Sequence, residues 1–566
     1  MTYWTLGVSA MRHDASAALF RDNQFVAAVE EERLTNRKHI GGWPFHAIGY
    51  VLNEAGIQPS DVNLVIDNFQ LSALLTNGAM DLARDTFDSR GEYFWKRLKS
   101  FSAVARNANR RQSAMHTQFP NARVTSAPHH LAHANYAVAS SNWEPGAVLT
   151  IDSIGESDTT TLFDFDGEGF RKCFALRSTD SLGYIYSAVT DLLGRRRNDE
   201  EGTIMALASL GDPSIHRDLF QQLIEITPTG YRVNRELANP RGFTSSIPRL
   251  KPDTVNRLGG FREPGAVLGP TEADVAAALQ ERTEQTIVHL AQLAKQHTKR
   301  EKLYVAGGVA MNCKSIGKIV SAGIFSSVHV PPSPGDAGTS IGAALHGLKD
   351  RFSPARDDSL TSAYLGPRYS NTSIDASLKE LNLNSTVHQD DLVQVIVDKL
   401  LDGQIVGVFH GNGELGPRAL GNRSILSAAT DAQVVERLAN DIKKREGFRP
   451  FAPAVLAEHA ADYFSPAHMT PYMSIALQAT EKARNEVPAV IHVDNSARVE
   501  TVTPQANTIL RKILEGYYRA SGIPVLINTS LNVKGRPTAG RPQDAIDAFL
   551  AMDLDAIAIE SHVISR

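Results

Sequence analysis

The chain has 566 residues, 42% of them hydrophobic and 21% charged, with a formal net charge of −4 at pH 7. This length predicts two or more domains, and the charge lacks the basic excess of a typical nucleic-acid-binding protein. No stretch reaches the ~18 uninterrupted apolar residues of a membrane span, and Arg12, His13 and Asp14 interrupt the apolar N-terminus where a signal peptide would need it intact. The only cysteines, Cys173 and Cys313, fit a reducing compartment. We expect a cytoplasmic protein with no membrane or nucleic-acid partner.

Two segments near the N-terminus resemble each other. TLGVSAMRHDASAALFRDNQFVAA and VLTIDSIGESDTTTLFDFDGEGFRK each read as a strand, a polar turn, a second strand ending in Leu-Phe, a charged turn and a third strand. Aligning Leu19 with Leu162 places Ser9 opposite Asp152. A duplicated hairpin whose turn faces a phosphate is the hallmark of the actin, Hsp70 and sugar-kinase architecture, so we predict an α/β first domain of two similar lobes. The alternative is that any two antiparallel hairpins look this much alike.

The first of these hairpins carries a candidate base. HDASAAL places His13 and Asp14 in its tight turn, where a neutral imidazole could take a proton from a hydroxyl. An exposed turn histidine with no role is the alternative. The charge run EEERLTNRKH, residues 30–39, is typical of a solvated face.

A histidine pair follows in PHHLAHANYAVAS. Pro128 favours a helix start, and His129 and His133 then lie four residues apart on one helical face, where both can reach one metal ion. Such a pair is also common on polar surfaces. Asp152 at the end of the strand VLTID and Asp336 in SPGDAGTS lie where loops expose side chains, although a turn residue and a helix N-cap are the alternatives. Two histidines with aspartates suit Fe(II), with Mn(II) or zinc as alternatives.

From Glu301 the pattern is that of an α/β unit. The strand KLYVAGG enters a glycine turn, a helix VAMNCKSIGKIV and a strand SSVHV follow, and an apolar helix IGAALHGL ends the unit. Gly307 and Gly308 let the backbone approach a ligand closely, with Asn312 beside them, although such turns are also packing devices.

Residues 351–368, which open with RFSPARDDSLTSA, are interpreted as a linker because they are polar, contain a proline and show no periodicity. We therefore predict domains over residues 1–350 and 369–566. The second has a helix around DLVQVIVDKLLDG, strands at QIVGVFHG and GIPVLINTSLN, further strands near AVIHVD, and a helix ending in IKKREGFRP.

The second domain carries a candidate anion site. GPRALGNRS, residues 416–424, has the glycine spacing of a phosphate-binding P-loop, but Asn422 stands where that motif needs lysine. Its cations lie mostly in loops or at element ends, and they are Arg418, Arg423, Lys443, Lys444, Arg445, Arg449 and Arg498. Such a cluster would repel itself without an anion, so a polyphosphate is the natural counterpart, with scatter over the surface as the alternative. Asn528 and Ser530 end a strand, where α/β sheets bind ligands.

Eight ordered motifs carry a resemblance to a known family. They are HDASAAL, EEERLTNRKH, PHHLAHA, AGGVAMN, SPGDAGTS, GELGPRALGNRS, KKREGFRPFAP and NTSLN. Together they resemble the O-carbamoyltransferases of nodulation-factor and antibiotic biosynthesis over essentially the whole chain. In that family the first domain is similar to the tRNA-threonylcarbamoyl transferase subunit, of actin-like duplicated fold, and the second is similar to the bacterial threonylcarbamoyl-adenylate synthase, a YrdC-like α/β fold.

The resemblance implies two half-reactions. In the second domain carbamoyl phosphate is cleaved and the carbamate attacks the α-phosphate of ATP, with Mg²⁺ expected on the ATP. This step yields carbamoyladenylate and pyrophosphate. In the first domain a hydroxyl of a small-molecule acceptor attacks the carbamoyl carbon, and AMP leaves.

The resemblance also implies site residues. His13 matches the general base, and Arg418 and Lys443 match catalytic positions at the nucleotide. The remaining matches are the metal ligands His129, His133, Asp152 and Asp336, the nucleotide-contacting Gly307, Gly308 and Asn312, and the positions Arg423, Arg449, Arg498, Asn528 and Ser530 that hold carbamoyl phosphate and nucleotide. One departure is Thr203, which stands where the family has lysine and removes one phosphate or substrate contact.

Two rival functions predict different products. An actin-like kinase or ATPase would release ADP rather than AMP. A non-catalytic module would bind metal and nucleotide without turnover. The acceptor class is left open, and so is a homodimer.

Overall fold

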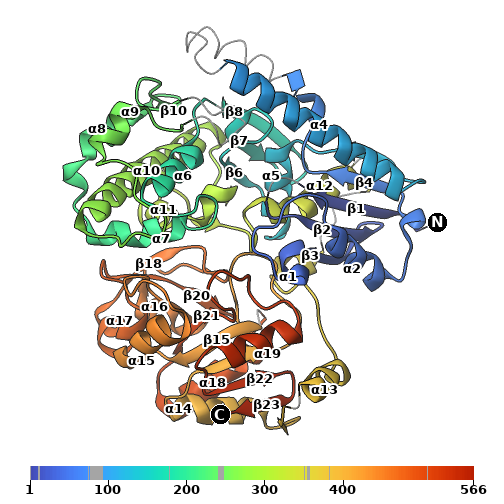
Figure 1. Ribbon diagram of the computed structural model, residues 1–566, viewed down its shortest axis with the longest axis vertical. Coiled ribbons are helices and arrows are strands. Elements are labelled where there is room, and N and C mark those ends of the chain that lie inside the picture. Colours follow the sequence, from blue (N-terminus) through green and yellow to red (C-terminus); the bar gives the residue numbers. More distant parts are fainter. Residues whose placement is uncertain are drawn as a thin grey trace. The chain divides into compact units, whose positions relative to one another are not determined.

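The computed structural model describes residues 2–10, 13–73, 75–76, 94–177, 179–239, 248–349, 351–352, 357–381, 383–505 and 508–566. It divides into two compact units (Figure 1). The first contains Met1–Val26, Gly41–Pro44 and Ile48–Thr361, and the second contains Ala27–Ile40, Phe45–Ala47 and Ser362–Arg566. The second unit thus includes short segments from the N-terminal part of the sequence, which a division at residue 350 assigns to the first domain.

Two five-stranded sheets in the N-terminal part of the fold share one topology. Their strand orders are β3-β2-β1-β4-β5 and β8-β7-β6-β11-β12. The strands are β1 Trp4–Ser9, β2 Ser16–Arg21, β3 Gln24–Glu30, β4 Leu64–Asp67, β5 Arg123–Ser126, β6 Gly146–Ile151, β7 Asp158–Phe165, β8 Phe170–Arg177, β11 Lys302–Ala306 and β12 Ser327–His329. In the first sheet β1 pairs antiparallel with β2 and parallel with β4, and β4 is parallel to β5. In the second sheet β6 likewise pairs antiparallel with β7 and parallel with β11, and β11 is parallel to β12.

The register of the two hairpins is also the same. Leu6 pairs with Leu19 in the first sheet, and Leu149 pairs with Leu162 in the second. Ser9 therefore lies at the position equivalent to Asp152, as the sequence alignment places it. The duplicated α/β fold predicted from the hairpins is confirmed.

Helices of the first unit include α4 Phe94–Gln118, α5 His129–Ala139, α6 Leu182–Leu192, α7 Glu201–Leu207, α8 Arg217–Leu223, α9 Pro252–Arg257, α10 Pro270–Thr298, α11 Cys313–Ser321 and α12 Thr339–Leu348, with a hairpin of β9 Ile224–Thr227 and β10 Gly230–Val233 (Figure 1). Of these, α4, α5, α10, α11 and α12 pack on strands of the two sheets. The helix α12 packs on both β1 and α5. A Cβ at Gly7 would lie 1.9 Å from the carbonyl oxygen of Ser340, and one at Gly342 would lie 1.8 Å from that of Ala132. Gly7 thus lets the start of α12 lie close to β1, and Gly342 lets it lie close to α5.

The second unit is built on an eight-stranded sheet of order β13-β23-β22-β14-β15-β21-β16-β20. Its strands are β13 Thr386–Val387, β14 Val406–Phe409, β15 Arg423–Ala428, β16 Ala452–Leu456, β20 Glu500–Val502, β21 Val525–Ser530, β22 Ala556–Ile559 and β23 His562–Ser565. A smaller sheet joins β17 Phe464–Ser465, β18 Ala476–Ala479 and β19 Ser496–Arg498. The unit's helices are α1 Glu31–Thr35, α13 Asn371–Glu380, α14 Leu392–Leu401, α15 Ala432–Arg437, α16 Ala460–Tyr463, α17 Glu481–Glu486, α18 Thr508–Ser521 and α19 Pro542–Ala551, and α2 Phe45–Ala55 starts in it.

The core of the second unit follows from helical periodicity. In α18 the residues Leu510, Ile513, Leu514 and Tyr517 recur at the spacing of one helical face. They pack with the apolar face of α14 and with sheet residues such as Leu526.

The strands predicted near AVIHVD flank it, because β18 ends at Ala479 and β19 begins at Ser496. Residues 489–494 are not themselves a strand, and Pro488–Val490 forms a 3₁₀ turn. Pro488 has no N–H for a ladder, and Asn495 has a positive φ of 61°, which interrupts extended backbone. The helix predicted to end in IKKREGFRP ends at Ile442, the first residue of that stretch, after a π turn over Leu438–Ile442. Among the described residues, no helix is both long and apolar enough to cross a membrane.

Candidate functional site

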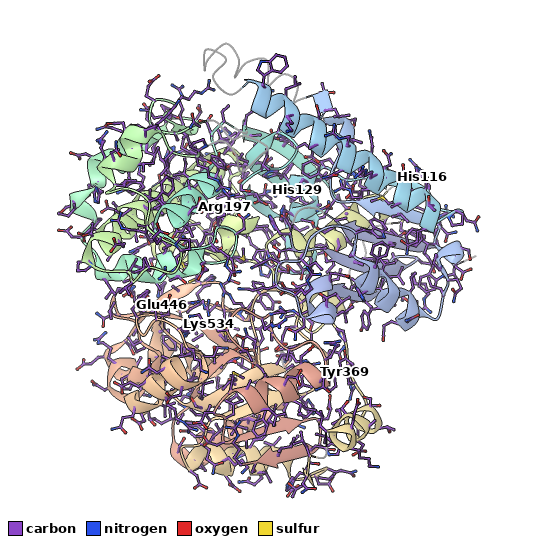
Figure 2. The ribbon with its side chains drawn as sticks, in the orientation of Figure 1. His116, His129, Arg197, Tyr369, Glu446 and Lys534 are labelled. Atoms are coloured by element: carbon purple, nitrogen blue, oxygen red, sulfur yellow. The ribbon has the colours of Figure 1, made fainter. Side chains whose placement is uncertain are left out.

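Four side chains converge at one point in the first unit. His129 and His133 come from α5, Asp152 follows β6, and Asp336 begins the short turn before α12. Their ligand atoms all lie within 4.8 Å of one another. His133 Nε2 lies 3.2 Å from both His129 Nε2 and Asp152 Oδ2, and Asp336 Oδ1 lies 3.6 Å from each Nε2. Figure 2 marks His129, the first residue of α5.

This donor set fits a single divalent ion. Ligand atoms that each lie about 2.1 Å from one ion are about 3.0 to 3.4 Å apart at octahedral or tetrahedral angles. The separations in the cluster are close to that range. His129 Nδ1 lies 3.3 Å from the carbonyl oxygen of Asn68, and an Nδ1–H donated there leaves the Nε2 lone pair for a metal.

The electrostatics of the cluster favour a cation. Burial lowers the pKa of His129, but its hydrogen bond to Asp152 and the charges of Asp152 and Asp336 outweigh burial and raise the pKa to about 9. The same opposition raises the pKa of His133. The two carboxylates thus favour positive charge between them, and a divalent cation can supply it in place of protons.

Gly307 and Gly308, predicted to lie near a ligand, bring the turn after β11 against the metal-ligand cluster. Gly307 has a φ of 90°, and a Cβ there would lie 2.2 Å from the carbonyl oxygen of Ile151. A Cβ on Gly308 would lie 3.3 Å from Asp152 Oδ1. Both glycines therefore allow close backbone approach at the residue that ends β6.

Asn312 is held within the fold. Its Oδ1 accepts the N–H of Ser315 at 3.1 Å and so caps α11, and it also accepts from Gln280 Nε2 at 3.1 Å. Its Nδ2 donates to Gln280 Oε1 at 3.0 Å. The structure thus gives Asn312 a capping role, and its contact with a nucleotide stays a prediction.

Two residues to which the sequence assigned no role support the metal-ligand cluster. Glu156 Oε1 accepts the backbone N–H of His129 at 3.0 Å and that of Gln70 at 2.8 Å, and so caps α5, whose N-cap residue makes no side-chain cap. His130 is buried and lies 2.6 Å from Thr150 Oγ1 and 2.9 Å from the carbonyl oxygen of Asp158. Burial and then the neighbouring histidines lower the pKa of His130 to about 3, so it is a neutral anchor for the β6–β7 turn. In the sequence, the only sign of these two roles is that Glu156 and His130 lie near the predicted metal ligands.

His13 lies within the electrostatic field of the same cluster. Its Nδ1 lies 3.0 Å from Asp14 Oδ2, and its side chain is 32% exposed. Burial lowers the pKa of His13, but Asp14, Asp336 and Asp152 together raise it to about 9. An Nδ1–H donated to Asp14 leaves Nε2 as the nitrogen that can accept a proton.

In the second unit an internal carboxylate occupies the N–H cradle of the P-loop-like segment. Glu414 Oε1 accepts the backbone N–H groups of Leu420, Asn422 and Arg423 at 2.8, 2.9 and 3.1 Å. A P-loop offers such N–H groups to phosphate oxygens. Here these three N–H groups already bond Glu414 and are not offered to a phosphate. The sequence did not single out Glu414, because nothing local marks a carboxylate that folds back onto the loop after it.

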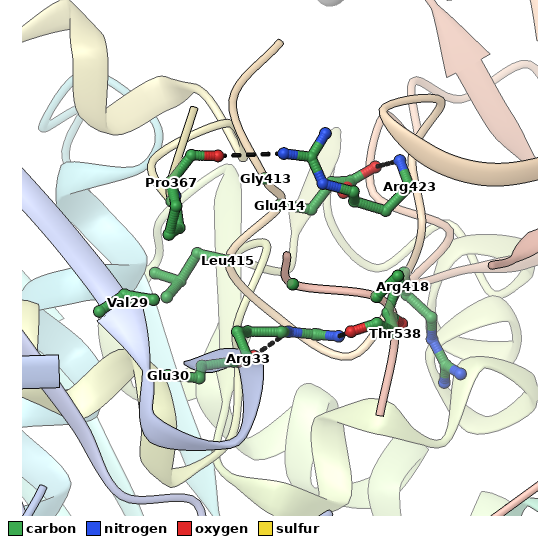
Figure 3. Close-up of a pocket in the computed structure, with 13 residues that line it drawn as sticks. Val29, Glu30, Arg33, Pro367, Gly413, Glu414, Leu415, Arg418, Arg423 and Thr538 are labelled. Carbon is green, nitrogen blue, oxygen red and sulfur yellow. Dashed lines mark hydrogen bonds and ion pairs between the residues drawn. The ribbon is translucent and has the colours of Figure 1, made fainter. Parts of the chain in front are cut away.

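The two arginines of this loop have different environments. Arg423 is 2% exposed and lies over the Phe409 ring at 3.7 Å. Its Nη1 and Nη2 donate to the carbonyl oxygens of His410, Asn422, Pro367 and Gly411 at 2.9 to 3.0 Å. The structure thus gives Arg423 an internal role, because both terminal nitrogens donate to backbone carbonyls, and its contact with a phosphate stays a prediction. Arg418 is only partly buried and points away from Arg423 (Figure 3).

Four of the remaining predicted cations, Lys443, Arg445, Arg449 and Arg498, are linked by electrostatic interactions, and Lys444 is exposed. Lys443 is buried, and its Nζ donates to the carbonyl oxygen of Ser530 at 2.7 Å and to Asn532 Oδ1 at 2.8 Å. Burial and the charges of Arg445 and Arg449 hold the pKa of Lys443 well below its usual value. Burial, Arg449 and Arg498 similarly lower the pKa of Arg445. Such mutual repulsion favours a bound anion.

Asn528 lies in β21 beside residues 416–424, which we call the arginine loop. Its Nδ2 donates to Glu500 Oε2 at 2.7 Å and to the carbonyl oxygen of Ala419 at 3.2 Å. Its buried Oδ1 has no hydrogen-bonding partner in the described part of the chain. Thr203 is buried in α7, and its Oγ1 likewise has no hydrogen-bonding partner in the described part of the chain.

Comparisons with known proteins show the family to which the chain belongs. A family model described as carbamoyltransferase N-terminus matches residues 4–345, and one described as carbamoyltransferase C-terminus matches residues 397–566. The nodulation protein NolNO of Sinorhizobium fredii is 33% identical, over 98% of this chain and 79% of that protein. The nodulation protein NolO of Bradyrhizobium diazoefficiens is 32% identical, over 77% of this chain and 78% of that protein. An uncharacterized protein of Synechocystis is 32% identical, over 99% of this chain and 96% of that protein. The chain belongs to the carbamoyltransferase family.

Proposed function

We propose that the chain is an ATP-dependent O-carbamoyltransferase that forms carbamoyladenylate in its second unit and transfers the carbamoyl group in its first. Membership of the family supports carbamoyl transfer. The division between the units is supported by their unlike sites, since one gathers imidazoles and carboxylates and the other gathers cations.

The first step needs dense positive charge. Hydrolysis of carbamoyl phosphate yields carbamate and phosphate, and a carbamate oxygen then attacks the α-phosphorus of ATP as pyrophosphate leaves. Lys443, Arg449 and Arg498 would hold the phosphates, with Arg418 at the reacting phosphorus. Preorganised cations stabilise the charge that develops on the phosphoryl oxygens. The lowered pKa of Lys443 supports this role, because a bound polyphosphate offsets the repulsion that lowers it.

The second step is the transfer to an acceptor hydroxyl. The hydroxyl oxygen forms a bond to the carbamoyl carbon, the bond from that carbon to the AMP oxygen breaks, and AMP leaves. His13 Nε2 would take the hydroxyl proton. A base must be neutral, and the pKa of His13 is about 9 in the field of Asp152 and Asp336. Positive charge bound at those carboxylates would bring the pKa down towards neutrality.

His129, His133, Asp152 and Asp336 would hold a divalent metal ion. Fe(II) is our first choice and Mn(II) or Zn(II) the alternatives, because mixed imidazole and carboxylate ligands suit all three. When bound, such an ion neutralises phosphate charge and makes AMP a better leaving group. The acceptor is proposed to be a hydroxylated natural product or sugar.

Product analysis tests the proposal. Incubation with carbamoyl phosphate, ATP and Mg²⁺ should release pyrophosphate even without an acceptor, and Arg418→Ala should abolish the release. Pyrophosphate that appears without carbamoyl phosphate, or ADP as the nucleotide product, would contradict the proposal. Screening hydroxylated natural products for the mass gain of a carbamoyl group would then identify the acceptor.

A further inference from the structure

The N-terminal segment of the second unit is buried where the sequence predicts a solvated face. The strand β3 runs into helix α1, and Ala27–Ile40 belongs to the second unit. Glu30 and Arg33 are each 6% exposed, and Glu31 is 4% exposed. By contrast, Arg37 in the same charge run is exposed.

Glu30 and Arg33 hold both backbone polar groups of Gly416. Glu30 Oε1 accepts the Gly416 N–H at 3.0 Å, and Arg33 Nη2 donates to the Gly416 carbonyl oxygen at 2.5 Å. The two side chains also bond each other, Arg33 Nε to Glu30 Oε2 at 2.7 Å, and Arg33 Nη1 reaches the carbonyl oxygen of Thr538 at 3.3 Å (Figure 3). Gly416 lies two residues before Arg418, so this pair fixes the backbone at the start of the arginine loop.

The packing leaves no room for a substrate between segment and loop. A Cβ at Gly540 would lie 1.8 Å from the carbonyl oxygen of Arg33, so α1 approaches the backbone there directly. The cavity lined by Glu30, Arg33 and Arg418 has a volume of about 10 Å³, which is roughly the space of one water molecule. The pair therefore acts on the loop as a clamp and is not itself a binding pocket.

The far side of the loop is held as well. Asn528 bonds the carbonyl oxygen of Ala419, and Glu414 holds the N–H of Leu420. Arg418 thus stands between fixed backbone groups on both sides, and Glu30 and Arg33 supply those on the N-terminal side. A catalytic guanidinium held in this way needs no reorganisation when charge develops on its ligand.

We propose that Glu30 and Arg33 are positioning residues for Arg418 in the adenylate-forming step. The role rests on the proposed function of the second unit. A misplacement of about 1 Å can cost a catalytic group on the order of 100-fold in rate, so loss of the clamp should lower kcat far more than it raises the KM for ATP.

The test measures carbamoyl-phosphate-dependent exchange of labelled pyrophosphate into ATP by the full chain. Arg33→Ala and Glu30→Ala should each lower kcat at least about tenfold, with less change in KM. Glu30→Gln, which keeps an acceptor for the Gly416 N–H, should be less impaired than Glu30→Ala. The matched control Arg37→Ala removes an exposed cation of the same segment and should behave as wild type. Unchanged kcat in folded Arg33→Ala and Glu30→Ala, or an equal loss in Arg37→Ala, would overturn the proposal.

Hydrogen exchange separates this role from the proposed function. The Gly416 amide should be protected in wild type and should exchange faster in Glu30→Ala and Arg33→Ala but not in Arg37→Ala; an unprotected Gly416 in wild type would refute the clamp. If Arg33→Ala does not fold, Glu30→Gln is the deciding variant. The role of the ion pair is overturned if this variant has both the wild-type kcat and the wild-type protection of the Gly416 amide. If the wild-type protein shows no pyrophosphate exchange but its Gly416 amide is protected, the proposed function is refuted. The role of Glu30 and Arg33 in the adenylate-forming step is then refuted too, although their contacts with Gly416 are still supported.

Discussion

Arg418 and Arg423 show how environment divides the roles of identical residues in one loop. Four backbone carbonyls and the Phe409 ring take up Arg423, whereas Arg418 stands partly exposed. Burial lowers the pKa of Arg423 only to about 10, so it is still charged at neutral pH and serves as an internal donor. Spacing in the sequence cannot tell these two environments apart.

Arg423→Ala should destabilise the second unit without removing a phosphate ligand. The variant leaves carbonyl groups without donors and opens a space beside Phe409, at a cost of about 3 kcal/mol. Thermal unfolding followed by circular dichroism should show a lower midpoint for the second unit, whereas Arg418→Ala should melt like wild type and lose pyrophosphate release. The reverse pattern would show that the roles are exchanged.

Lys443 should make anion binding depend on pH. Burial and neighbouring cations lower its pKa in the free protein, and a bound polyphosphate would raise it again. Between these two pKa values binding takes up a proton, so affinity for ATP should fall as pH rises through that interval, at pH values where phosphate groups with a pKa of about 6 are already ionised. Calorimetric titration in buffers of different ionisation enthalpy measures this uptake.

Lys443→Met should lose the proton uptake, and Lys444→Met, at the exposed neighbour, should keep it. An affinity that rises with pH in wild type would contradict the assignment.

At the scale of elements, the starts of helices bring the metal-ligand cluster together. Helix α5 supplies both histidines from its first two turns, and Glu156 caps it from the β6–β7 turn. Residues at strand ends and helix starts meet at one edge of an α/β sheet, and this is why the duplicated fold and the four candidate ligands could be predicted from the sequence. The capping role of Glu156 could not be predicted, because its partners are backbone N–H groups, which leave no pattern in the residue sequence.

Glu156→Ala should weaken metal binding about 10- to 100-fold, the usual effect of losing a residue that orients a ligand. Without its acceptor the N-terminal turn of α5 would no longer hold His129 in place. Titration with Mn(II) or Zn(II) followed by metal analysis measures the change. Glu156→Gln should keep most of the affinity, and Glu168→Ala, at an exposed glutamate in the turn between β7 and β8, should bind as wild type. Equal affinity in Glu156→Ala would refute the capping role.

At the scale of the whole molecule, the two units do not follow the order of the chain. Composition and the polar stretch near residue 355 indicate a break, and the structure divides the later part of the chain at Thr361 and Ser362. The segment Ala27–Ile40 could not be assigned to the second unit from sequence. Its charged residues have the pattern of an exposed surface, because their partners at Gly416 and Gly540 are remote in the chain.

The central claim is that the units carry out separable half-reactions. His133→Ala removes one imidazole from the metal-ligand cluster, and Arg418→Ala removes one guanidinium from the second unit. Because the proposed sites lie in different units, each variant should lose only its own property.

The most direct measurement is carbamoyl-phosphate-dependent pyrophosphate exchange into ATP, with metal content determined on the same samples. We predict that His133→Ala loses metal and exchanges at the wild-type rate, while Arg418→Ala keeps metal and does not exchange. Loss of both properties in either variant would contradict the account.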